Sequence, residues 1–102
     1  MIKVVYQAEE GKIYLKVSGH ASSALYGQDL VCASVSSITT GALNALENPT
    51  SFKIVAREGL LELTSLSQTT NHDSIVLHTM LTQLETIAES YPQYINISRK
   101  GK

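Results

Sequence analysis

Two pairs of short runs in which apolar and polar residues alternate, each pair followed by a longer stretch with helical spacing, form the basic pattern of the chain. Residues 2–7 and 13–18 are rich in β-branched and aromatic side chains, and the five residues between them include Gly11, which can adopt a positive φ. Residues 51–56 and 60–65 repeat this arrangement across another glycine-containing turn. The pattern therefore predicts two β-hairpins.

A first helix is predicted after the first hairpin, from about Leu30 to Glu47. Asp29 stands at the position expected of an N-cap, and Asn48-Pro49 ends the stretch because the residue before a proline is biased out of the α region. The apolar residues that recur at helical spacing are Leu30, Val31, Val35, Ile38, Ala42, Leu43, Ala45 and Leu46.

A second helix follows the second hairpin. Thr70-x-x-Asp73 resembles a capping box, and the stretch must end before Pro92. Its apolar stripe consists of Leu77, Met80, Leu81, Leu84, Ile87, Ala88 and Tyr91.

The order of these elements defines the expected fold class. Residues 94–98 alternate like a short terminal strand, so the order is ββαββα(β). Hairpins without alternating βα units favour an α+β fold with a mainly antiparallel sheet, and two helices with one apolar face each favour two layers with both helices on one face. At 102 residues we expect a single domain over residues 1–102, while the strand order cannot be read from the sequence.

Composition narrows the class of protein. The net charge of -1 provides no bulk attraction to nucleic acid or to an anionic membrane, so we expect neither as a direct partner. One cysteine cannot form an internal disulfide, and charged residues soon follow the N-terminus, so we expect a cytoplasmic protein without a signal peptide. No apolar run approaches the roughly 20 residues that a membrane-spanning helix needs.

The only cysteine, Cys32, is the candidate nucleophile. If Asp29 is the N-cap, Cys32 is the third helical residue and lies among backbone N–H groups without intrahelical partners, which favour a thiolate. A cysteine nucleophile also needs a base, and His20 is the nearest histidine in the sequence. The residues alone leave open whether Cys32 is a nucleophile or a packed core residue.

The sequence contains no pattern typical of a metal site or a phosphate-binding site. His72 and His78 are six residues apart, which is neither i,i+3 nor i,i+4 spacing, so we interpret both as helix-surface residues. No set of histidine, cysteine and carboxylate residues has zinc-ligand spacing, and no glycine-rich phosphate loop is present. We therefore expect no metal and no cofactor.

Three short motifs resemble a known family when they are taken together. They are Gly19-His20-Ala21, Gly27-Gln28-Asp29 and Val31-Cys32-Ala33-Ser34-Val35-Ser36. The chain resembles the ribosomal-processing cysteine protease (Prp) family at these positions, and also in the Asn48-Pro49 break and in the ending at residues 88–95.

The resemblance implies a cysteine endopeptidase with a catalytic dyad of Cys32 as the nucleophile and His20 as the general base. It implies cleavage of a short N-terminal extension from a large-subunit ribosomal protein precursor, after paired apolar or aromatic residues. It also places Gly19, Asp29 and Ser36 at the site and suggests a homodimer. A non-catalytic ribosome-assembly or binding module with a structural cysteine is the alternative hypothesis.

The segment between the two catalytic candidates is predicted to be a loop over residues 21–28. Four of its eight residues are alanine or serine, so little apolar burial opposes its conformational entropy. We expect it to be poorly ordered in the free protein and to close over an extended peptide.

Overall fold

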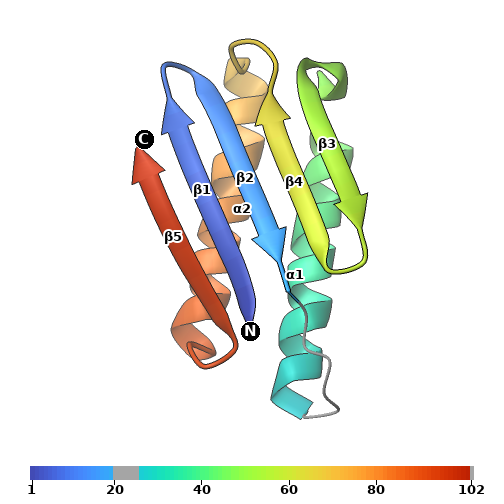
Figure 1. Ribbon diagram of the computed structural model, residues 1–102, viewed down its shortest axis with the longest axis vertical. Coiled ribbons are helices and arrows are strands. Elements are labelled where there is room, and N and C mark those ends of the chain that lie inside the picture. Colours follow the sequence, from blue (N-terminus) through green and yellow to red (C-terminus); the bar gives the residue numbers. More distant parts are fainter. Residues whose placement is uncertain (20–25, 102) are drawn as a thin grey trace.

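The structure is a computed structural model that describes residues 1–19 and 26–101, with the side chains of residues 26–29 left out of the description. The elements are the strands β1 (Ile2–Glu9), β2 (Lys12–Ser18), β3 (Phe52–Arg57), β4 (Leu60–Ser65) and β5 (Ile95–Gly101), the helices α1 (Tyr26–Ala45) and α2 (Asn71–Ser90), and a short 3-10 turn at Pro49–Ser51. The predicted order ββαββα(β) is confirmed (Figure 1).

The five strands form one sheet in the order β3-β4-β2-β1-β5. The pairs β1–β2, β2–β4 and β3–β4 are antiparallel, as expected of hairpins, whereas β1 and β5 are parallel. The sheet is therefore mixed and mainly antiparallel, because the chain crosses from β4 to the far edge through α2 before it forms β5.

The β1–β2 hairpin shows how local sequence fixes the register. Glu10 and Gly11 both have positive φ, at 52° and 78°, which is the backbone of a tight hairpin turn. Glu9 consequently pairs with Lys12, and further along the ladder Tyr6 pairs with Leu15. The pairing places the buried residues of both strands on the same face of the sheet.

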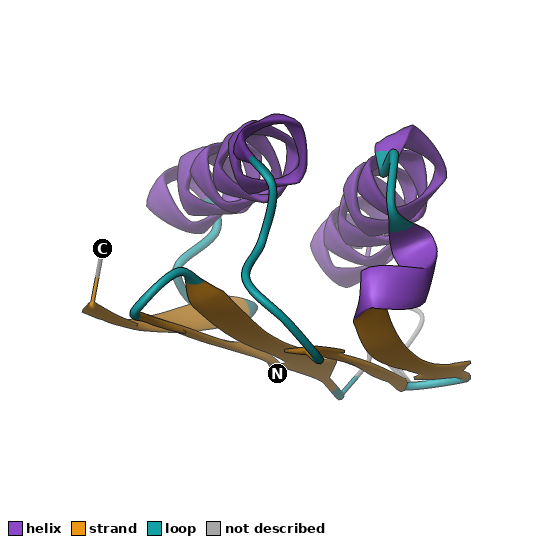
Figure 2. Cartoon of the chain, turned by 90° about the horizontal axis from the view of Figure 1, so that it is seen from above, coloured by secondary structure: helices purple, strands orange, loops and turns teal. Residues whose placement is uncertain are grey.

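Both helices cover one face of the sheet, which confirms the two-layer α+β architecture (Figure 2). The core fills the space between the layers. Its buried apolar residues are Ile2, Val4, Tyr6, Ile13, Leu15, Val17, Val31, Val35, Ala42, Leu46, Phe52, Leu61, Leu63, Leu77, Met80, Leu81, Leu84 and Ile95. Of the described helices, neither is both long enough and apolar enough to cross a membrane.

The start of α2 confirms its predicted cap. The Thr70 side chain accepts a hydrogen bond from the Asp73 backbone N–H at 3.2 Å, and the helix ends at Ser90, before Pro92. The last strand is longer than predicted, because its parallel pairing with β1 continues as far as Gly101.

The predicted start of α1 is wrong. The helix begins at Tyr26, so Asp29 is its fourth residue and not its N-cap, and residues 26–28 of the predicted loop are helical. Gly27 suggested a loop, but one glycine costs a helix only about 1 kcal/mol, which the buried face of a 20-residue helix outweighs.

Candidate active site

Cys32 is the seventh residue of α1 and is half-buried. A helix that begins at Tyr26 leaves only about its first four backbone N–H groups without intrahelical partners, and the Cys32 N–H lies beyond them. The effect of the helix dipole also falls off within the first turn. The predicted position of Cys32 among the free N–H groups at the helix start is therefore wrong.

Cys32 instead opens onto a partly open cavity of about 230 Å³ between α1 and one end of the sheet. The wall contributed by the sheet comes from β1, β2, β3, β4 and the turns at their ends, and it includes Ile2, Val17, Gly19, Ala56, Arg57, Gly59, Leu60 and Leu61. The wall contributed by the helix consists of Cys32, Val35, Ser36, Thr39, Thr40 and Leu43. More of the lining of the cavity is therefore apolar than polar, with serine and threonine residues along the helix and Arg57 on the side of the sheet.

Ser36 lies one helical turn after Cys32 and lines the same cavity, so the structure brings these two predicted site residues together. Asp29 lies three residues before Cys32 in the same helix, and its side chain is outside the description.

Gly19 is the third predicted site residue at the cavity. It follows the last residue of β2, has a φ of +87°, and donates its backbone N–H to the Gly59 carbonyl at 3.0 Å. A Cβ at this position would collide with the Met1 carbonyl oxygen, so the sequence needs glycine here. The backbone of the residue that precedes His20 is thus fixed beside the cavity.

His20 itself lies outside the described residues, as do residues 21–25 of the predicted loop. The dyad of Cys32 and His20 and the closing of the loop over a peptide therefore stay predictions.

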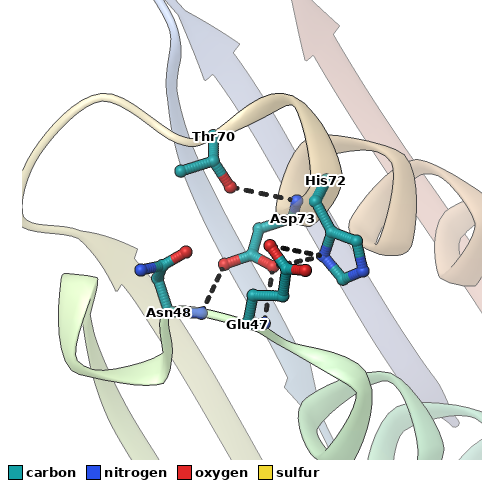
Figure 3. A network of polar contacts seen from close by, with 5 residues as sticks. All are labelled: Glu47, Asn48, Thr70, His72 and Asp73. Carbon is teal, nitrogen blue, oxygen red and sulfur yellow. Dashed lines mark hydrogen bonds and ion pairs between the residues drawn. The ribbon is translucent and has the colours of Figure 1, made fainter.

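A polar cluster that sequence reasoning missed joins the two helices at the opposite end of α1 (Figure 3). The Asp73 side chain is only 1% exposed and accepts hydrogen bonds from the backbone N–H groups of Glu47 at 2.8 Å and of Asn48 at 3.0 Å. His72 Nδ1 lies 2.9 Å from Asp73 Oδ1 and 3.9 Å from Glu47 Oε2. Asp73 thus fastens the segment after α1 to the start of α2, which the capping-box pattern alone could not show.

The cluster shifts the pKa values of Asp73 and His72. Burial raises the pKa of the Asp73 carboxyl, but the hydrogen bonds from His72 and from the Glu47 and Asn48 backbone outweigh it and hold the pKa below 3.8. The hydrogen bond to Asp73 raises the pKa of His72 above 6.5, with a further contribution from the Glu47 carboxylate.

The histidine predictions are correct in part. His72 is exposed at the helix start, as expected, whereas His78 is half-buried and its ring forms a T-shaped contact with the Tyr6 ring at a centroid distance of 5.9 Å. No group of three histidine, cysteine or carboxylate residues that could hold a metal ion occurs within residues 1–19 and 26–101, side chains 26–29 aside.

Comparison with known proteins assigns the family. Residues 1–96 match the family described as cysteine protease Prp. The chain belongs to the cysteine protease Prp family. The ribosomal processing cysteine protease Prp of Mycoplasma pneumoniae is 38% identical over 90 residues, which cover 86% of this chain and 88% of that protein.

Two solved structures of a Prp protease share the fold. The essential ribosomal processing protease Prp from Staphylococcus aureus in complex with a substrate peptide has a TM-score of 0.84 and 31% identity, over 98% of this chain and all of that one. The same protease with a covalently linked product peptide has a TM-score of 0.82 and 32% identity, with the same coverage. The chain is thus a cysteine protease, and its one cysteine lies on the cavity described above.

Proposed function

We propose that this Prp-family protease removes a short N-terminal extension from a large-subunit ribosomal protein precursor, with Cys32 as the nucleophile and His20 as the general base. The observation that carries the proposal is the position of the only cysteine at a cavity with a more apolar than polar lining, beside the strand end that leads to residue 20. The named relatives, which process ribosomal proteins, support the substrate class.

The chemistry follows from a thiol and an imidazole. His20 takes the Cys32 proton, the sulfur attacks the scissile carbonyl, and the resulting imidazolium protonates the leaving amine as the C–N bond breaks. Water then attacks the acyl-enzyme, with His20 as base, and releases the carboxylate and the thiol. No step needs an oxidant, a metal or an organic cofactor.

The cavity suits the predicted cleavage position. Its walls carry aliphatic side chains from both layers of the fold. An apolar or aromatic side chain next to the scissile bond would be buried there, which is favourable. Ser36 lies one turn from the thiol and is available to a bound peptide, and Gly19 holds the chain that leads to the base. Asp29, on the same helix, is proposed as a supporting residue of the site.

The test is to incubate the protein with a peptide that spans the cleavage region of the precursor and to follow the products by mass spectrometry. We expect wild type to cleave at one bond, Cys32→Ala to lose cleavage entirely and His20→Ala to lose at least about 100-fold in rate. Thermal melts should show that both variants remain folded. Cleavage by Cys32→Ala at the wild-type rate would contradict the assignment of the nucleophile.

Family membership decides against the alternative of a non-catalytic binding module. The homodimer, the cytoplasmic location and the absence of a direct nucleic-acid partner stay predictions. Light scattering at several protein concentrations would test the first of these.

A further inference from the structure

The cavity beside Cys32 continues well beyond the thiol along α1. Cys32, Ser36 and Thr40 follow one another at intervals of four residues and all line it, and Leu43 lies at its far end. Because a helix rises 1.5 Å per residue, Thr40 lies about 12 Å along the axis from Cys32. The cavity is therefore a strip along the helix and not a pocket for one side chain only.

This strip lies on the flank of α1 that faces away from α2. The groove between the two helices is lined by other residues of α1, among them Ser37, Ile38 and Gly41. Across the strip stand Ala56 at the end of β3 and Leu61 in β4. The space beside Ser36 and Thr40 is thus bounded by α1 and the β3–β4 hairpin.

The hydroxyl groups along the strip differ in whether the fold already uses them. Thr39 is buried and donates its hydroxyl to the Val35 carbonyl at 2.8 Å, so its hydrogen bond belongs to the helix. Ser36 and Thr40 are exposed, and their side chains make no hydrogen bond with any other described residue. These two hydroxyls are available to a bound molecule.

We propose that Thr40 is a specificity-determining residue for the substrate, at a subsite three or four residues from the scissile bond. The inference rests on the proposed function. An extended peptide rises about 3.3 Å per residue, so the 12 Å from Cys32 to Thr40 corresponds to three or four residues. The strip is continuous with the thiol, and its occupant is an extended segment of the substrate.

In the proposed arrangement the segment lies on the acyl side of the scissile bond. That half of the substrate stays attached to Cys32 until water releases it, so contacts made along the strip stabilise both steps of the reaction. In this arrangement the Thr40 hydroxyl forms a hydrogen bond with a main-chain group of the peptide, and the aliphatic wall receives its side chains.

The experiment measures kcat/KM for precursor peptides with two to six residues on the acyl side. For wild type we expect kcat/KM to rise with each residue up to about four and then to level off. Thr40→Val keeps the shape of the side chain and removes the hydroxyl, so it should lose about three- to tenfold on the long peptides. On the two-residue peptide it should match wild type.

Thr79→Val is the matched control, because Thr79 is an exposed threonine of α2 that lines the groove between the helices and not the strip. It should behave as wild type on every peptide. An equal loss by Thr40→Val on short and long peptides, or no loss on any, would overturn the subsite. The subsite would also be overturned if kcat/KM depended only on the number of peptide residues on the leaving side of the scissile bond.

A second measurement separates failure of this inference from failure of the proposed substrate. Peptidyl chloromethyl ketones of one to five uncharged residues alkylate a reactive cysteine without any ribosomal sequence. We expect the rate of Cys32 alkylation to rise with length up to about four residues and to fall in Thr40→Val for the longest reagents only. If precursor peptides are not cleaved but this pattern holds, the subsite stands and the substrate is wrong; a rate independent of length overturns the subsite.

Discussion

At the scale of single residues, the buried Asp73 carboxylate holds together parts of the chain that are far apart in sequence. Its two oxygens accept hydrogen bonds from the backbone of Glu47 and Asn48, more than twenty residues earlier, while its own backbone N–H is bound by Thr70. A buried carboxylate is tolerated because three donors stabilise its charge.

Asp73→Asn should lower the free energy of unfolding by about 2 kcal/mol at neutral pH. The amide nitrogen of asparagine is a donor, so it cannot accept the hydrogen bond from the backbone N–H that it then faces. The folded-state pKa of Asp73 lies below 3.8, so this contribution is present above that pH and is lost as the pH falls through the folded-state value. Urea denaturation at several pH values should therefore show the difference between variant and wild type shrinking in acid.

Glu85→Gln is the control for that experiment. Glu85 also lies on α2, but its side chain is 41% exposed and its pair with Arg99 spans 3.4 Å, so its loss should cost about 0.5 kcal/mol or less. A difference between Asp73→Asn and wild type that stays constant from neutral to acid pH would contradict the charged role of Asp73.

At the scale of elements, α1 combines the chemistry of the site with its architecture. One flank provides Cys32 and Ser36 to the cavity, another faces α2, and the buried face packs on the sheet. The strand end that meets this helix depends on Gly19, whose positive φ and close approach to Met1 exclude other residues.

Gly19 and Gly41 form a matched pair for testing whether Gly19 fixes the end of β2 beside α1. Gly41→Ala should raise stability by about 0.5–1 kcal/mol, because Gly41 lies within α1 and no neighbouring atom lies within 4 Å of an added Cβ. Gly19→Ala should lower stability by about 1–3 kcal/mol and reduce cleavage, because its backbone must move. Thermal melts and the cleavage assay would measure both, and a neutral Gly19→Ala would mean that the β2 end is not fixed.

At the scale of the whole molecule, the sheet order places β4, β2 and β1 between two edge strands. The three interior strands carry much of the buried core, and both helices pack on the same face of the sheet (Figure 2). Stability should therefore be lowest at the edges and highest in the middle of the sheet.

Hydrogen exchange should show this gradient. We expect the amides of β1 and β2 that pair within the sheet to exchange only through global unfolding, and those of the edge strand β3 to exchange faster. Mass spectrometry of peptic fragments would resolve the strands. Slower exchange in β3 than in β2 would indicate that the β3 edge is covered, as in an interface between two copies.

The sequence by itself determined the elements and their class. Alternation over residues 2–7, 13–18 and 60–65 and helical spacing after Thr70 are local patterns, and each was sufficient to predict its strand or helix. The three motifs around His20 and Cys32 likewise led to the protease family, because they are specific when taken together.

Only the tertiary structure decided the strand order, the start of α1 and the neighbours of Cys32. The parallel pairing of β1 with β5 and the bonds from Asp73 to Glu47 and Asn48 join residues far apart in sequence, which no local pattern encodes. The start of α1 at Tyr26 goes against the local preference of Gly27, because burial of the helix face outweighs a cost of about 1 kcal/mol. The strip from Cys32 to Thr40 exists only because the β3–β4 hairpin packs opposite that flank of the helix.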